Sequence, residues 1–168
     1  MKIIDNFLNQ EEFNNIKNVM TGRYFPWYYA PCANNNNDNL SQLTYFFYTA
    51  ENDTPVNGDI KLIKPILNKL KCTALIRIKA NLTYPSINKK EFYHKDNYFK
   101  NATTAVYYLN NNNGGTKFKL KSKIKFIESK ANRMVIFPSH IEHSVVRHSN
   151  NDSGRFVINF NYYTDENI

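Results

Sequence analysis

Cysteine and long apolar runs are both scarce in this 168-residue chain. Its two cysteines, Cys32 and Cys72, are too few for a disulfide scaffold and lack the spacing of a metal site. Free thiols in a reducing compartment are therefore expected. The N-terminal segment 1–13 becomes polar after a few residues, and no run has the length of a signal sequence or a membrane span. These absences predict a soluble, cytoplasmic protein without a membrane partner.

Acidic side chains are also few, because 14 Asp and Glu residues stand against 22 Lys and Arg residues and give a formal net charge of +8. A polyanionic partner such as a nucleic acid therefore has to be considered. The lysines are scattered along the chain except in 117–126, where they alternate with other residues. That alternation predicts a pair of strands with one charged, solvated face. Nucleic acid is thus the less favoured partner.

The length and the 42% hydrophobic content suffice for one compact domain, so residues 1–168 are expected to form a single unit. Residues 1–72 carry helical patterns and are expected to support the rest. Residues 73–163 read as strands and glycine-containing turns. The predicted fold is mainly β with flanking α: an antiparallel, double-layered jelly roll whose N-terminal helices pack on the outer sheet.

Two helices are expected in the N-terminal region. Asn9 and Glu12 form a capping signature ahead of a helix over about 10–20. A second helical stretch covers 60–70 and contains Pro65. A proline there should kink the helix or mark its true start.

Two segments alternate between apolar and polar side chains, as strands with one buried face do. In 74–84 the apolar face ends with Tyr84, which is therefore predicted to be buried. The opposite face carries Arg77, Lys79, Asn81 and Thr83. In the second segment one face carries Arg155, Val157, Asn159 and Asn161, and the other carries Phe156, Ile158 and Phe160. An arginine and two asparagines on one face need a polar lumen or a ligand to satisfy them.

His94 and Asp96 form a pair of candidate metal ligands, because side chains two positions apart on a strand project to the same face while Lys95 points away. His143 follows about fifty residues later in FPSHIEHSV. Two imidazoles and one carboxylate are the ligand set of non-haem Fe(II) oxygenases, which keep open coordination positions. Downstream, Arg155 offers a permanently charged fork that suits the far carboxylate of a dicarboxylate cosubstrate.

Two further histidines compete with His143 as ligands. His140 lies three residues before it, but Pro138 and the β-rich flanks make a helical pair improbable. His148 lies in the turn-rich stretch RHSNNDSG, which predicts a solvated side chain. Neither is assigned to the metal.

Motifs in a fixed order surround these residues. LTYPSINKKEFYHKDN contains Tyr-Pro and His-x-Asp-Asn, TTAVYYLNNNNGGTKF contains Tyr-Leu-Asn and a glycine pair, and NRMVIFPSHIEHSV leads into the third ligand. Together with the strand that begins at Arg155, they resemble the Fe(II)- and 2-oxoglutarate-dependent dioxygenases, in particular their prolyl 4-hydroxylase-like branch. The resemblance covers roughly residues 74–163.

This resemblance implies a double-stranded β-helix that binds Fe(II), 2-oxoglutarate and O2, with ascorbate as an expected reductant. The iron ligands that it implies are His94, Asp96 and His143. Arg155 and Tyr108 would hold the far carboxylate of 2-oxoglutarate, and Tyr84 would line the pocket nearer the iron. The implied activity is hydroxylation of a substrate C–H bond with release of succinate and CO2.

A protein or peptide is the leading substrate class that the resemblance suggests. The loop with Lys89, Lys90 and Glu91 corresponds to one that closes over a peptide in prolyl hydroxylases. The aromatic residues Tyr24, Trp27, Tyr28 and Tyr29 would either line a peptide groove or pack the N-terminal region onto the sheet.

Two other functions stay open. A nucleic-acid demethylase of the same superfamily would suit the basic charge, but such enzymes typically carry a second arginine six residues after the first, where this chain has Asn161. A non-enzymatic jelly-roll binding module is the other alternative. The full set of three ligands and an arginine argues against it.

Overall fold

The structure, a computed structural model, describes residues 1–32, 41–50, 56–58, 60–86, 91–96, 100–150 and 154–165. Lys89 and Lys90, which were predicted to belong to a substrate-covering loop, lie outside these ranges. No helix in the described ranges is both long and apolar enough to cross a bilayer.

Strands dominate the described part of the chain. They are β1 (Lys2–Ile4), β2 (Tyr28–Ala30), β3 (Gln42–Thr49), β4 (Ala74–Thr83), β5 (Thr103–Tyr108), β6 (Gly115–Leu120), β7 (Lys123–Glu128), β8 (Arg133–Pro138), β9 (His143–Val146) and β10 (Arg155–Tyr163). The helical elements are α1 (Gln10–Thr21), the 3-10 helix η1 (Ile60–Ile63) and α2 (Lys64–Leu70).

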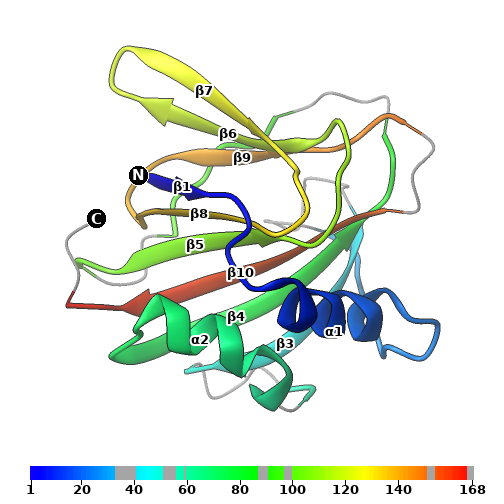
Figure 1. Ribbon diagram of the computed structural model, residues 1–168. Helices are drawn as coiled ribbons and strands as arrows, with labels where there is room; N and C mark the ends of the chain where they lie inside the picture. The colour runs from blue at the N-terminus through cyan, green and yellow to red at the C-terminus, as the bar shows by residue number, and fades with distance from the viewer. Residues whose placement is uncertain are drawn as a thin grey trace.

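The strands form two antiparallel sheets, as predicted for a jelly roll (Figure 1). The major sheet has seven strands in the order β1-β8-β5-β10-β4-β3-β2, and the minor sheet has three in the order β7-β6-β9. Because β1, β2 and β3 join the major sheet, residues 1–72 are more than a helical support.

The inner face of the major sheet, defined here as the face toward the minor sheet, packs against it in one apolar cluster. Val106, Tyr108, Val135, Phe137 and Val157 come from the major sheet, and Phe118 and Ile127 come from the minor sheet. Antiparallel pairing places Val157 opposite Tyr108, so alternate residues of β10 and β5 share this inner face.

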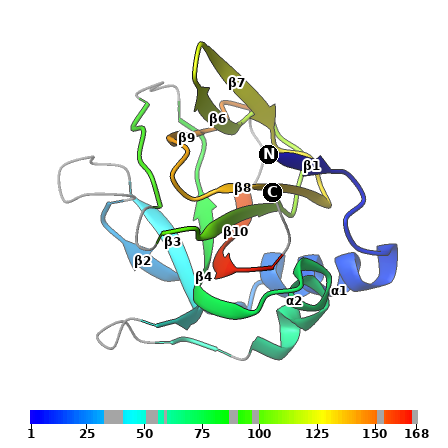
Figure 2. The ribbon, with the colours of Figure 1, turned by 90° about the vertical axis from the view of Figure 1, so that its left-hand side faces the viewer.

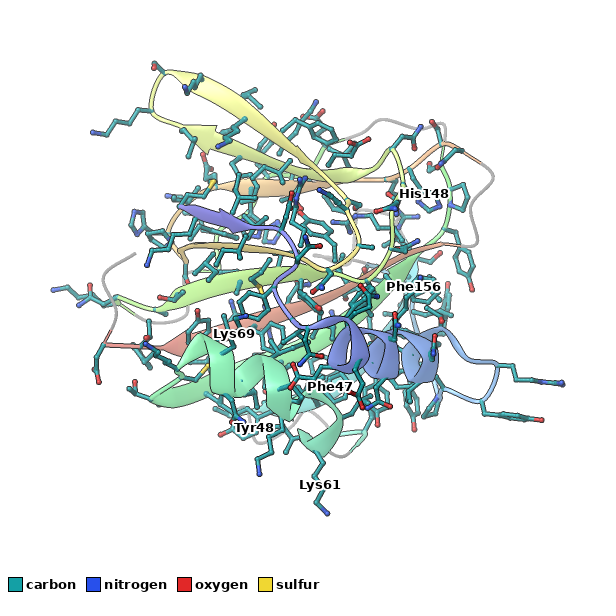
Figure 3. All side chains as sticks on the ribbon, in the orientation of Figure 1. Phe47, Tyr48, Lys61, Lys69, His148 and Phe156 are labelled. Carbon is teal, nitrogen blue, oxygen red and sulfur yellow. The ribbon has the colours of Figure 1, made fainter. Side chains whose placement is uncertain are left out.

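The two helices cover the outer face of the same sheet, as Figure 2 shows from the side. Phe47 and Phe156 point from the sheet into this helical layer (Figure 3) and belong to the larger core with Ile16 and Ile66. Trp27 packs there too, 5.9 Å from Phe156 between ring centroids, and its indole N–H donates to the carbonyl of Met20 at 3.2 Å.

Both predicted helices are confirmed. The Asn9 side chain accepts a hydrogen bond from the amide of Glu12 at 2.9 Å, which caps α1. Pro65 lies in the first turn of α2, so the proline marks the start of the helix, where its missing N–H is not needed.

The lysine-rich hairpin differs from its prediction. Lys117 pairs with Phe126 and Lys119 with Ile124, whereas Lys125 pairs with Phe118. Directly opposed residues share a face, so the lysines of β6 lie on one face of the hairpin and those of β7 on the other. The two-residue connection between the strands pairs odd-numbered residues with even-numbered ones, and this register cannot be read from the alternation alone.

Candidate metal centre and carboxylate pocket

Three side chains predicted to bind a metal meet between the two sheets. Nε2 of His94 lies 3.8 Å from one carboxylate oxygen of Asp96, and Nε2 of His143 lies 3.8 Å from the other. One ligand atom from each residue lies within 4.8 Å of the other two. Ligand atoms about 2 Å from a common ion lie at most about 4 Å apart, so small side-chain rotations bring all three onto one ion.

The backbone fixes the two histidines beside each other. His94 and His143 form a bridge in which each amide donates to the other residue's carbonyl at 2.9 Å. The amide of Asp96 donates to the carbonyl of Ser139 at 3.0 Å, which ties the third ligand to the turn after β8. The triad therefore combines β9 of the minor sheet with a segment that crosses between the sheets.

The imidazole rings are oriented for metal binding through Nε2. Nδ1 of His143 lies 3.0 Å from the carbonyl oxygen of Ile141, and Nδ1 of His94 lies 3.5 Å from that of Phe92. A proton on Nδ1 leaves Nε2 with its lone pair, which is the usual arrangement of a ligating histidine. Burial lowers the pKa of His143 despite the nearby carboxylate of Asp96, so its ring is neutral at pH 7 and ready to bind a cation.

Asp96 is held by three residues on the inner face of the major sheet. Thr104 Oγ1 donates to its carboxylate at 3.2 Å, Asn161 Nδ2 donates at 3.0 Å, and the Arg77 guanidinium lies 3.6 Å away. Burial alone would raise the pKa of Asp96, but the Arg77 guanidinium and the hydrogen bond from Asn161 help to lower it. The ligand therefore stays ionised at neutral pH.

Arg155 forms the second half of the site. It is 3% exposed, and its guanidinium donates to the Ser129 hydroxyl at 3.0 Å and to the Thr116 hydroxyl at 3.3 Å. Tyr108 lies beside it, with its ring centroid 5.4 Å from the guanidinium carbon, and shares a hydrogen bond of 2.7 Å with Thr116. Burial raises the pKa of Tyr108, so its phenol keeps its proton and can donate.

Two polar atoms next to Arg155 are buried and have no hydrogen-bond partner among the described residues. They are Oδ1 of Asn81 and Oγ1 of Thr83. Thr83 pairs directly with Arg155 across β4 and β10, and Asn81 pairs with Val157. We call the set Arg155, Tyr108, Thr116, Ser129, Asn81 and Thr83 the carboxylate pocket.

The residues of the carboxylate pocket fit the far carboxylate of a ligand such as 2-oxoglutarate. A fully buried guanidinium that contacts only neutral hydroxyls is costly without an anion, and Arg155 has no carboxylate partner in the described ranges. The pocket also adjoins the metal triad, because Thr116 lies two residues from Phe118, which pairs with His143. Two residues along a strand span about 7 Å. A ligand with a carboxylate at each end can therefore reach both halves.

Tyr84 does not share this environment. It follows the last residue of β4 and is 49% exposed, so its predicted burial is wrong. The apolar side of β4, with Ala80 and Leu82, faces the helices, and the polar side with Asn81 faces the site. A part for Tyr84 in cosubstrate binding stays a prediction.

The two histidines excluded from the metal site lie apart from the triad's set of ligand atoms. His140 is exposed in the turn after β8. His148 is fully buried rather than solvated, and Figure 3 places it among the loops beyond β9. Its carbonyl accepts from the amide of Ser86 at 2.9 Å, so the stretch packs against the segment after β4.

Sequence reasoning missed most residues that position the ligands. Asn161 was expected on a polar face, but its contact with Asp96 depends on a segment 65 residues away. Thr104 and Thr116 lie in the segment TTAVYYLNNNNGGTKF, but no role was predicted for either side chain. The pattern that could have indicated them was the alternation of polar side chains in otherwise apolar strands, which placed Arg77 and Thr83 on a polar face.

A model of the 2OG-Fe(II) oxygenase superfamily matches residues 83–163 of the chain. The matched segment contains the whole metal triad and Arg155. This match spans just under half of the chain, and together with the triad it supports the 2OG-Fe(II) oxygenase superfamily and a 2-oxoglutarate-dependent non-haem iron dioxygenase. Fe(II), 2-oxoglutarate and O2 are the cofactor and cosubstrates of that class.

Solved structures share the fold. A prolyl hydroxylase from Trichoplax adhaerens, in complex with a hypoxia inducible factor oxygen degradation domain peptide fragment, has a TM-score of 0.72 at 17% identity and covers 96% of this chain and 82% of its own. An oxidoreductase of the 2OG-Fe(II) oxygenase family from Burkholderia pseudomallei has a TM-score of 0.71 at 12% identity, covering 95% and 83%. A prolyl-4-hydroxylase from Pseudomonas putida has a TM-score of 0.60 at 15% identity, covering 97% and 92%.

At these identities the structural likeness concerns the fold alone. No curated protein matches the chain in a direct sequence comparison. The substrate therefore has to be inferred from the residues of the site.

Proposed function

We propose that this dioxygenase hydroxylates a C–H bond of a protein or peptide, in the manner of the prolyl hydroxylases. The observation that carries the proposal is the pairing of the metal triad with the buried Arg155. The triad supplies two imidazoles and one carboxylate, which leave coordination positions open on an iron ion. Arg155 supplies the fork for a carboxylate at the other end of the cosubstrate.

His94, Asp96 and His143 would hold the iron, and the carboxylate pocket would hold 2-oxoglutarate. When bound, the iron and its cosubstrates supply the oxidation that places a hydroxyl on the substrate and releases succinate and CO2. Arg155 and Tyr108 orient the far carboxylate with one charged and one neutral donor. The orphaned oxygens of Asn81 and Thr83 accept hydrogen bonds from bound water or from the substrate side of the pocket.

The remaining contribution of the chain is to exclude water and to fix the ligands. Asn161, Thr104 and Arg77 hold the Asp96 carboxylate in one orientation before any ion arrives. Phe118 and Phe137 pack around the His143 ring, with centroids 6.1 and 5.0 Å away, and shield it from solvent. Ascorbate as a reductant stays a prediction from the resemblance.

A peptide substrate is supported by two observations. The Trichoplax prolyl hydroxylase, whose fold the chain shares, was solved with a peptide fragment bound. The exposed aromatic residues Tyr24, Tyr28 and Tyr29 lie outside the core, whereas Trp27 packs within it. Trp27 thus takes the packing role predicted for this segment, and Tyr24, Tyr28 and Tyr29 are exposed and accessible to a peptide.

The test is an anaerobic titration followed by turnover. Purified protein is mixed with Fe(II) and 2-oxoglutarate, the weak visible charge-transfer band of the chelate is recorded, and succinate is measured after O2 is admitted. We expect a band and succinate from the wild-type protein and neither from His143→Ala, because the variant lacks one of three ligands. His140→Ala is the matched control and should behave as wild type. Folded wild-type protein without band or succinate would instead indicate a binding module.

Substrate class is tested in the same assay. Proline-containing peptides are expected to stimulate succinate formation and to gain one oxygen atom by mass spectrometry. Faster 2-oxoglutarate consumption with a methylated oligonucleotide than with these peptides would reassign the protein as a nucleic-acid demethylase, which the net charge of +8 would suit.

A further inference from the structure

Lys79 lies on the inner face of β4, between the two halves of the site. It pairs with Asn159 on β10 and with Phe46 on β3. Two residues before it, Arg77 belongs to the metal half, and two residues after it, Asn81 belongs to the carboxylate pocket. Side chains two positions apart on a strand share a face, so the two cations Arg77 and Lys79 and the amide of Asn81 lie in one row. Lys79 occupies the middle of that row.

Cys32 and Asp96 act on the Lys79 ammonium as opposite charges, but only at longer range. Its Nζ lies 5.3 Å from the centroid of the Phe46 ring, and across the described ranges it makes no hydrogen bond or ion pair. Burial, and then the like charge of Arg77, lower the pKa of Lys79 to about 8. The group is therefore still mostly protonated at neutral pH, and a largely desolvated cation of this kind is stabilised by an anion.

Asp96, the acidic member of the triad, is already engaged. Asp96 receives hydrogen bonds from Asn161 and Thr104 and lies 3.6 Å from the Arg77 guanidinium. It also faces both histidines of the triad. Among the described residues Asp96 forms no ion pair with Lys79 and raises its pKa only through its charge at longer range.

We propose that Lys79 binds a carboxylate of the substrate beside the metal, so that the preferred substrate is an acidic peptide with Asp or Glu next to the hydroxylated residue. This inference rests on the proposed function. The cosubstrate's far carboxylate has Arg155, and its near end has the iron, which leaves Lys79 for a third anion. The excess of 22 basic over 14 acidic side chains attracts such a substrate from a distance.

The experiment compares two probes that differ only in charge, N-acetyl-prolyl-glutamate amide and N-acetyl-prolyl-glutamine amide. Each is titrated into the anaerobic complex of the protein with Fe(II) and 2-oxoglutarate, and binding is measured by calorimetry. Wild type should bind the glutamate probe about tenfold or more tightly than the glutamine probe, as a charge-assisted hydrogen bond predicts. Lys79→Met should lose the preference, and Lys79→Arg should keep it. The exposed Lys123 gives the matched control Lys123→Met, which should match wild type.

Each other outcome overturns the assignment for a distinct reason. Equal or undetectable binding of the two probes by wild type, or a preference that persists in Lys79→Met, removes Lys79 from substrate recognition. A tenfold loss of 2-oxoglutarate affinity in Lys79→Met, read from the charge-transfer band, means that the lysine holds the cosubstrate instead. The absence of that band in wild type overturns the proposed function itself, and with it this inference.

Discussion

At the scale of single residues, Asn161 links three parts of the metal half. Its Nδ2 donates to Asp96 and to Thr104, both at 3.0 Å, and its Oδ1 accepts from Arg77 at 3.1 Å. Partners of this kind orient a ligand without touching the ion. The position that holds a second arginine in nucleic-acid demethylases therefore serves the carboxylate ligand here.

Asn161→Ala should weaken metal binding, because Asp96 loses its best-placed donor and becomes free to rotate. The expected loss in affinity is about 10- to 100-fold. It is measured by titrating Mn(II) into the metal-free protein and following the paramagnetic signal of free Mn(II). Asn113→Ala, at an exposed site, should leave the affinity unchanged. An unaltered affinity in Asn161→Ala would mean that the backbone alone orients Asp96.

Arg155→Lys should raise the KM for 2-oxoglutarate by about tenfold or more and leave metal affinity unchanged. Lysine keeps the positive charge but loses the planar fork that reaches Ser129 and Thr116 and a carboxylate together. Initial rates of succinate formation over a range of 2-oxoglutarate concentrations give KM and kcat separately. A fall in kcat at constant KM would contradict the proposal that Arg155 binds the carboxylate of 2-oxoglutarate, and would indicate another role for the arginine.

The sequence could predict which three residues come together as candidate metal ligands, but not the residues that support them. His94 and Asp96 follow from a local rule, the two-residue repeat of an extended chain. Thr104 and Asn161 reach Asp96 through strand registers that are set by long-range packing, which no local pattern contains. Tyr84 was misplaced because apolar alternation was taken to mark the site, whereas it marks the contact with the helices.

At the scale of elements, strand β1 is attached to the sheet edge by charge as well as by backbone pairing. Asp5 follows β1 and accepts two hydrogen bonds from the Arg133 guanidinium, at 2.6 and 3.1 Å, and one from Lys130 at 2.8 Å. The hydrogen bonds from Arg133 and Lys130 hold the pKa of Asp5 well below its ordinary value of 3.8. The carboxylate is therefore ionised at neutral pH and well into the acidic range.

Asp5→Asn should remove a pH-dependent part of the stability. A carboxyl with a lowered pKa stabilises the folded state above its unfolded pKa, and the effect fades as pH falls through the folded value. Urea midpoints should therefore show wild type more stable than the variant by about 1 kcal/mol or less at neutral pH, since the pair is partly exposed, and the difference should shrink below about pH 4. Glu142→Gln, which breaks the exposed pair with Lys119, is the control. A difference independent of pH would assign the loss to packing.

Elements were predicted well where the signal was local. The cap at Asn9 and the proline at the start of α2 specify their helices through neighbouring backbone groups. The assignment of lysines to the two faces of the β6–β7 hairpin was wrong. The face on which Lys123 lies depends on the length of the connection between the two strands. The strand β3 was absent from the prediction, since QLTYFFYT packs on both faces and lacks clean alternation.

At the scale of the whole molecule, one buried side chain joins the N-terminal layer to the major sheet. Asn132 Oδ1 accepts from the amide of Leu8 at 2.9 Å and from the Tyr107 hydroxyl at 2.6 Å, and its Nδ2 donates to the carbonyl of Leu8 at 2.9 Å. Its backbone has a φ of 61°. Asparagine tolerates that left-handed conformation better than most residues.

Asn132→Gly should lower the free energy of unfolding by about 3 kcal/mol, because a buried amide and a buried phenol lose their acceptor. Asn132→Ala should cost about 1 kcal/mol more, since alanine is strained at this φ and glycine is not. Urea unfolding of both variants separates the side-chain effect from the backbone effect. Equal stability of wild type and Asn132→Gly would show that the layer is held by apolar contacts alone.

The placement of the triad has a mechanical consequence for the sandwich. His143 belongs to the minor sheet, while Asp96 is bonded to Thr104 and Asn161 of the major sheet. An ion bound by both residues would link the two sheets, so the free energy of metal binding would add to the free energy needed to separate them. Removal of that ion would then weaken the contact between the sheets beside His143, where Phe118 and Phe137 pack around the ring.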